Sequence, residues 1–71
     1  MNENMNYPEG TIVSFKHSGR TYQGKVAYGL ARNYGTPDAP DWYFQWTSET
    51  GGFGYVKQIA DNVTSVAFTS S

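Results

Sequence analysis

The chain is short, rich in aromatic residues and nearly balanced in charge. Its 71 residues make one domain, near the lower size limit at which a hydrophobic core is stable without disulfides or a bound metal. The absence of cysteine excludes disulfides and thiolate metal sites. Five Lys/Arg residues against six Asp/Glu residues, for a net charge of −1, argue against backbone binding to duplex nucleic acid.

The composition predicts a small all-β domain. Aromatic residues make up 17% of the chain and Leu30 is the only leucine, whereas helical domains are usually rich in leucine. We expect one domain over residues 7–68, with flexible ends at 1–6 and 69–71. The lack of a long apolar run, of a signal peptide and of cysteine leads us to expect a cytoplasmic protein that does not meet a membrane.

Two strands are predicted in the first half of the chain. Residues 11–17 alternate, with Val13 and Phe15 on one face, and Ser18-Gly19-Arg20 is a hairpin turn. A second strand is expected from residue 21 to about 31. Its shared face should carry Tyr22, Gly24, Val26, Tyr28 and Leu30. Glycines at 24 and 29 predict a bulge or a close backbone approach in this strand.

The segment around which the fold is organised has four aromatic rings in six residues. Residues 32–41, with one glycine and two prolines, are predicted to be the longest loop. In the strand that follows, Trp42, Phe44 and Trp46 are two residues apart and should line the core, while Tyr43 should face the other way.

The last third of the chain predicts two more strands. Residues 47–52 are a turn, 53–59 a fourth strand, 60–62 one 3₁₀ turn and 63–68 a fifth strand. Residues 55–66 also have helical spacing, and an amphipathic helix there is the alternative. The preceding glycines and the β-branched residues favour strands, and closing five strands into a barrel would remove exposed edges.

The order of these elements resembles that of the SH3-like small barrels, including Tudor and KOW domains. The residues that carry the likeness are Gly10-Thr11-Ile12-Val13, Tyr22-Gln23-Gly24-Lys25-Val26, Trp42-Tyr43-Phe44-Gln45-Trp46 and Gly54-Tyr55-Val56-Lys57-Gln58-Ile59. The resemblance implies a five-stranded barrel with a 3₁₀ turn before the last strand, and it implies no particular activity.

The chain is also similar to the type II dihydrofolate reductases around Ser18-Gly19 and Tyr22-Gln23-Gly24-Lys25-Val26. In that family a Val-Gln-Ile-Tyr run in the penultimate strand lines the pore of a tetramer. The matching place here reads Tyr55-Val56-Lys57-Gln58-Ile59, without that order, so the resemblance implies the fold and not the activity.

No catalytic or metal-binding constellation is predicted. His17 is the only histidine, and we interpret it as a turn histidine because a general base needs an orienting carboxylate and a pocket. The carboxylates show no calcium-loop spacing, and Gly51-Gly52-Phe53-Gly54 lacks the lysine and helix of a phosphate loop. We therefore expect no enzyme activity, no cofactor and no metal.

The surplus of aromatic rings predicts a binding surface, because a barrel of this size cannot enclose twelve of them. We expect a non-enzymatic module that engages a protein or peptide partner through Tyr28, Tyr34, Tyr43 and Tyr55, with a methyl-lysine cage as a variant. A phage or mobile-element protein that acts on a host protein is one hypothesis of origin.

Three alternatives remain open at the level of sequence. The rings would stack on single-stranded nucleic acid if a local basic patch contacted the phosphates, with the candidate cations being Lys16, Arg20, Lys25, Arg32 and Lys57. An enzyme would require a multimer with a shared pore. A homodimer would form through an open strand edge.

Overall fold

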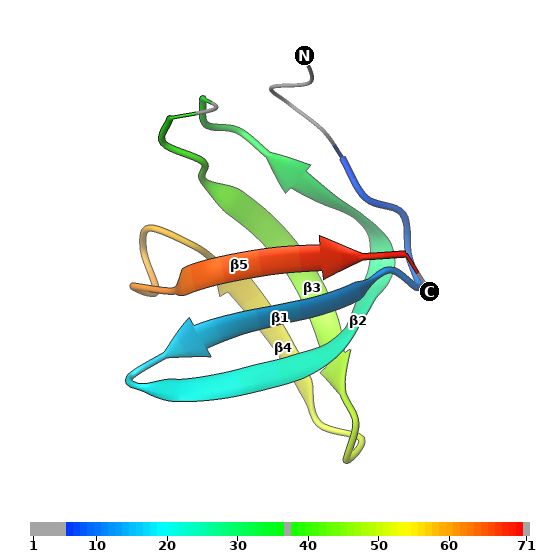
Figure 1. Ribbon diagram of the computed structural model, residues 1–71. Coiled ribbons are helices and arrows are strands. Elements are labelled where there is room, and N and C mark those ends of the chain that lie inside the picture. The colour runs from blue at the N-terminus through cyan, green and yellow to red at the C-terminus, as the bar shows by residue number, and fades with distance from the viewer. Residues whose placement is uncertain (1–5, 37, 71) are drawn as a thin grey trace.

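A computed structural model describes residues 6–36 and 38–70, which form one antiparallel sheet of five strands (Figure 1). The strands are β1 (Ile12–His17), β2 (Arg20–Asn33), β3 (Trp42–Ser48), β4 (Phe53–Lys57) and β5 (Thr64–Thr69). Their spatial order is β4-β3-β2-β1-β5. The described part of the chain contains no helix, so the all-β prediction is confirmed and the alternative helix over 55–66 is wrong.

The predicted strands all exist, with shifted ends. β2 extends two residues beyond the predicted end, so that Arg32 and Asn33 belong to the sheet and the loop begins at Tyr34. β4 ends at Lys57 rather than at Ile59, because the chain turns there. The predictions for residues 1–5, Pro37 and Ser71 concern positions outside the described residues.

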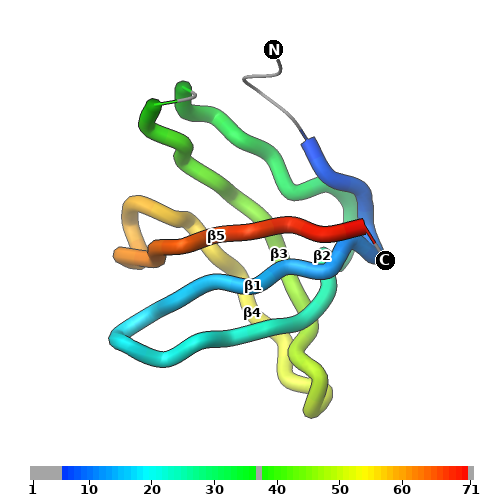
Figure 2. Tube along the Cα trace, viewed as in Figure 1, coloured from blue at the N-terminus to red at the C-terminus, as the bar shows by residue number. Residues whose placement is uncertain are grey.

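β2 is shared between two parts of a strongly bent sheet, as Figure 2 shows by the curve of the chain between residues 20 and 33. It pairs with β3 at Ala27↔Gln45 and again at Arg32↔Tyr43, and the register shifts between these pairs. Tyr28 (φ 58°) and Gly29 (φ 126°) both have positive φ in the shifted stretch. This bulge at Gly29 confirms the prediction made from the glycine.

The bulge overturns the predicted face of β2 beyond Val26. Tyr28 is 72% exposed and Leu30 is 43% exposed, whereas Gly24 and Val26, which were expected to share a face with them, are buried. Strict alternation fails because a left-handed backbone at two successive residues rotates the strand. Ala31 takes the core position instead and is fully buried.

The core lies on the concave side of the bent sheet. Phe44 is 2% exposed and Trp42 is 8% exposed, so the predicted inward face of the aromatic strand is confirmed. Trp46 is partly buried and packs edge-on against Phe15, with ring centroids 5.2 Å apart. The other buried apolar residues are Val13, Phe15, Val26, Ala31, Val56 and Val63.

Glycine at 24 and at 54 makes room for the Trp46 indole. A Cβ at Gly24 would overlap the Thr47 carbonyl oxygen and lie 2.7 Å from Trp46 Cε3. A Cβ at Gly54 would lie 2.5 Å from Trp46 Nε1. The close backbone approach predicted at Gly24 is therefore present.

The two ends of the sheet, β4 and β5, are not paired with each other, so the hydrogen-bond ladder does not close. Residues 58–62 form a turn in which the Asn62 N–H donates to the Ile59 carbonyl at 3.2 Å. Within the described residues, no helix is long and apolar enough to cross a membrane.

Candidate functional site: an aromatic face on β2, β3 and β4

The convex face of β2, β3 and β4 carries side chains in rows that follow the strand register. One row is Arg32–Tyr43–Lys57, because Tyr43 is paired with both cations across the two ladders. The next rows are Ala27–Gln45–Tyr55 and Lys25–Thr47–Phe53. Residues directly opposite in register project to the same side of a sheet, so these rows share the face away from the core.

Five aromatic rings gather on this surface, which we call the tyrosine face: Tyr28, Tyr34, Tyr43, Phe53 and Tyr55. Tyr43 and Tyr55 meet edge-to-face, with ring centroids 5.1 Å apart and an interplanar angle of 86°. Tyr28 and Phe53 meet in the same way at 5.5 Å and 85°. Edge-to-face packing is a preferred arrangement of aromatic pairs, so these rings hold one another in place.

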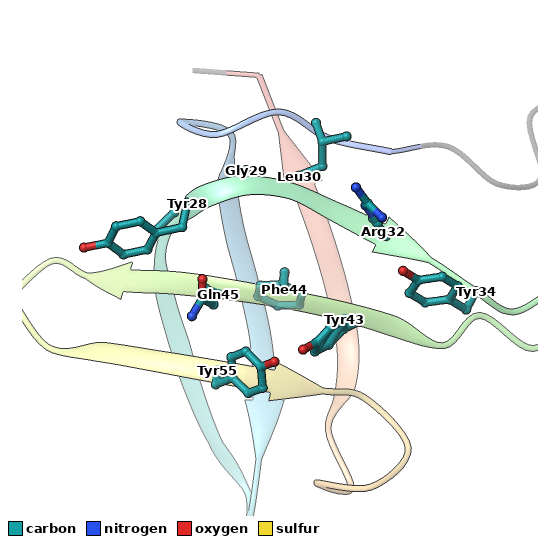
Figure 3. Close-up of a pocket in the computed structure, with 10 residues that line it drawn as sticks. Tyr28, Gly29, Leu30, Arg32, Tyr34, Tyr43, Phe44, Gln45 and Tyr55 are labelled. Atoms are coloured by element: carbon teal, nitrogen blue, oxygen red, sulfur yellow. The ribbon is translucent and has the colours of Figure 1, made fainter.

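The four tyrosines named from the sequence all line one open hollow of about 270 Å³ on this face (Figure 3). β2 and the start of the loop after it supply most of the lining, and β3 and β4 supply the rest. The residues from β2 and the loop are Ala27, Tyr28, Gly29, Leu30, Arg32 and Tyr34, and those from β3 and β4 are Tyr43, Phe44, Gln45 and Tyr55. The bulge creates the hollow because it lifts Tyr28 out of the alternating pattern and carries it toward Phe53. The prediction that these tyrosines belong together is consistent with this placement, and whether they bind a partner stays a prediction.

Tyr34 is positioned by the loop that joins β2 to β3. The Asn33 side-chain oxygen accepts hydrogen bonds from the backbone N–H of Gly35 at 2.9 Å and of Asp41 at 3.1 Å. The Tyr34 N–H donates to the Asp41 carbonyl at 3.1 Å, which closes the base of the loop. Tyr34 is 65% exposed beside Tyr43, with ring centroids 6.4 Å apart.

The five candidate cations do not form one patch. Lys25, Arg32 and Lys57 lie on the tyrosine face, and the Lys57 ammonium lies 5.8 Å from the Tyr55 centroid and 6.0 Å from that of Tyr43. Lys16 and Arg20 lie at the β1–β2 hairpin, where Lys16 pairs with Thr21 and Arg20 with His17. The structure therefore brings three of the five onto the aromatic surface.

A second hollow of about 600 Å³ adjoins the tyrosine face near the end of β4. This hollow shares three of its lining residues, Tyr34, Tyr43 and Lys57, with the tyrosine face. Its wall also contains Ile59, which is 65% exposed. Asp41 also lines it, and the Ile59 N–H lies 3.4 Å from the Asp41 carboxylate. The tyrosine face therefore continues past Tyr43 into a surface with an acidic and an apolar residue.

His17 lies away from this face, half-buried at the end of β1, with its ring centroid 6.5 Å from that of Tyr22. Among residues 6–36 and 38–70, no three His, Asp or Glu side chains cluster as metal ligands would.

Two residues of this surface were missed in the site predicted from sequence. Phe53 is 58% exposed and completes the ring pair with Tyr28. Its separation of two residues from Tyr55 was the available signal, since both must lie on one face of β4. Leu30 was expected on the same face as Val26, because the rotation of β2 at Tyr28 and Gly29 cannot be deduced from an alternating pattern.

Comparisons of the chain with protein-family models, with curated proteins and with solved structures find no match.

Proposed function

We propose that the tyrosine face binds an extended segment of a protein partner. The observation that carries this proposal is the gathering of four tyrosines around one hollow, with the exposed Phe53 ring packed against Tyr28 beside it. Singly exposed hydrophobic residues are normal, but contiguous apolar patches mark interaction surfaces. Tyrosine suits such a surface because it offers a large contact area and loses little side-chain entropy on binding.

The chemistry of the face indicates the segment that would fit. The hollow between Tyr28, Leu30 and Tyr55 would take an apolar or aromatic side chain, and the tyrosine hydroxyls and Gln45 would bind polar backbone groups. Arg32 and Lys57 lie on the two sides of Tyr43. An acidic residue two or three positions from the apolar residue of the segment would therefore lie close to one of these cations.

A methyl-lysine ligand fits this face less well than an acidic segment. The Lys57 ammonium already lies within about 6 Å of two of the rings, where a bound cation would have to sit. A second cation would be repelled by Lys57 and by Arg32.

The direct test is a selection of random twelve-residue peptides displayed on phage, with the Tyr43→Ala/Tyr55→Ala protein used for counter-selection. We expect enrichment of peptides that combine an apolar or aromatic residue with an acidic one. Synthetic versions should bind in the micromolar range, measured by fluorescence polarisation, and should lose at least tenfold in affinity against Tyr43→Ala.

The matched control pair for charge is Lys57→Ala against Lys16→Ala. Both are exposed lysines on strands, but only Lys57 lies on the tyrosine face. Lys57→Ala should weaken the selected peptides and Lys16→Ala should leave their affinity unchanged. Equal effects of the two variants, or peptides that bind the counter-selection protein equally well, would refute the proposed site.

Single-stranded nucleic acid is the second candidate, favoured by the position of Lys25, Arg32 and Lys57 beside the exposed rings. Bases stack on aromatic side chains while lysine and arginine contact phosphates, and such binding weakens steeply with salt. The probe is a labelled oligothymidylate. Binding that falls at least tenfold between about 50 and 200 mM salt, and that is lost in Tyr55→Ala, would support this candidate over the peptide.

The proposal extends to the fold. We infer that the bent sheet is an SH3-like barrel whose closure between β4 and β5 is made by side-chain packing, with the turn over residues 58–62 in the place of the 3₁₀ turn. The order of five strands and the long, bent β2 support this inference. Grooves lined with aromatic side chains on such small barrels suit extended peptides, which agrees with the proposed ligand.

A further inference from the structure

The open edge of β4 has a backbone hydrogen-bonding pattern that can be worked out residue by residue. The Gln58 N–H donates to the Trp42 carbonyl at 2.8 Å, and the Ser48 N–H donates to the Gly52 carbonyl at 2.8 Å. Between these two pairs, antiparallel geometry makes Gly54 and Val56 the residues whose N–H and C=O groups face β3. The N–H and C=O groups of Phe53, Tyr55 and Lys57 therefore point to the outer edge.

One end of this edge is already occupied. The Lys57 N–H donates to the Asp61 carboxylate at 2.9 Å, and the Lys57 carbonyl accepts from the Asp61 N–H at 2.9 Å. The turn over residues 58–62 thus covers Lys57, and no described strand pairs with the rest of the edge. Two donors and two acceptors remain, all from Phe53 and Tyr55.

From this pattern we propose that β4 pairs with β4 of a second copy of the chain, antiparallel and around a two-fold axis at Gly54. In that register Phe53 lies opposite Tyr55 of the second copy, and Tyr55 lies opposite its Phe53. Each of these pairs exchanges two hydrogen bonds, so all four open groups are satisfied without using Lys57. The pairing is self-complementary, as a two-fold interface requires.

Three further features fit a second copy in this register. Gly54 would face Gly54 across the axis in a pair whose side chains approach closely, and neither residue has a side chain to clash. Phe53 and Tyr55 would form two aromatic cross-strand pairs on the tyrosine face, which stays open to a ligand. Lys57 would come beside the turn that holds Glu49 of the second copy, which joins opposite charges.

The first measurement is the mass in solution as a function of concentration, by sedimentation equilibrium of the full chain. We expect the mass to rise from one chain to two between micromolar and millimolar concentrations. A chain made by synthesis and ligation with the Tyr55 backbone nitrogen methylated keeps every side chain but lacks one edge donor. This chain should need at least tenfold higher concentration to dimerise.

The register is tested by charge. Because residue 53 lies opposite residue 55 of the second copy, Phe53→Lys/Tyr55→Lys should be monomeric and Phe53→Lys/Tyr55→Glu should recover the dimer. Circular dichroism establishes that both variants are folded. The proposal is overturned if the wild-type chain keeps the mass of one chain at millimolar concentration. It is also overturned if methylation leaves the concentration needed for dimerisation unchanged, or if the two charge variants dimerise equally. If methylation instead weakens only a peptide selected by display, the edge takes a peptide strand and not a second copy.

Discussion

Replacing the two neighbours Phe44 and Tyr43 by alanine tests the face assignment on which both proposals depend. Phe44 is buried and packs edge-on against Phe15 and Phe68, at centroid distances of 5.9 and 5.5 Å. Removing such a ring costs about 3–5 kcal/mol, from lost transfer free energy and from the cavity left behind. Tyr43 is half-buried on the opposite face, and its loss should cost about 1 kcal/mol, close to the worth of its contact with Tyr55.

The size of the domain makes this difference easy to measure. A chain of 71 residues has a free energy of unfolding of about 4–11 kcal/mol. Phe44→Ala should therefore remove a large share of it, whereas Tyr43→Ala should leave a folded protein. With a dependence of about 1 kcal/mol per molar urea, the two midpoints should differ by about 2–4 M.

The assay is urea unfolding followed by tryptophan fluorescence and circular dichroism, with Phe44→Leu as a variant that keeps most of the apolar volume. Phe44→Leu should fall between the wild type and Phe44→Ala. If Tyr43→Ala were as destabilising as Phe44→Ala, β3 would be shifted by one residue relative to its neighbours. Such a shift exchanges the two faces, so it would remove the tyrosine face from the surface.

Two further substitutions test how the site is held. Gly24→Ala should destabilise the protein by about 1–3 kcal/mol, because the new Cβ would overlap the Thr47 carbonyl oxygen and press on Trp46; an unchanged urea midpoint would contradict the close approach. Asn33→Ala should cost about 1–3 kcal/mol, because it removes the acceptor for two backbone N–H groups at the loop base. It should also speed amide hydrogen exchange at residues 34–36, 38, 39 and 41 and weaken the binding of any selected peptide that contacts Tyr34. Unaltered exchange in these residues would show that the contacts to Asn33 do not order the loop.

Local chemistry in the sequence was enough to determine the strands. The glycine and proline clusters mark the turns, and the alternation in residues 11–17 and 42–46 identifies which residues are inward. That information is local, because a strand displays successive side chains on opposite faces whatever its partners are. For the same reason Tyr43 was expected on the face opposite Trp42 and Phe44, where the structure has it half-buried.

The tertiary structure alone decided where β2 rotates and how the sheet ends. The sequence predicts a bulge at Gly29, but the positive φ of Tyr28 and the exposure of Leu30 depend on β2 meeting β3 at Gln45 and again at Tyr43. Likewise, the open edge at Phe53 and Tyr55 depends on which residues of β4 face β3 and on Asp61 folding back onto Lys57. These features arise from pairing between segments that are distant in the sequence. The register of such a pairing cannot be deduced from the sequence of one strand alone.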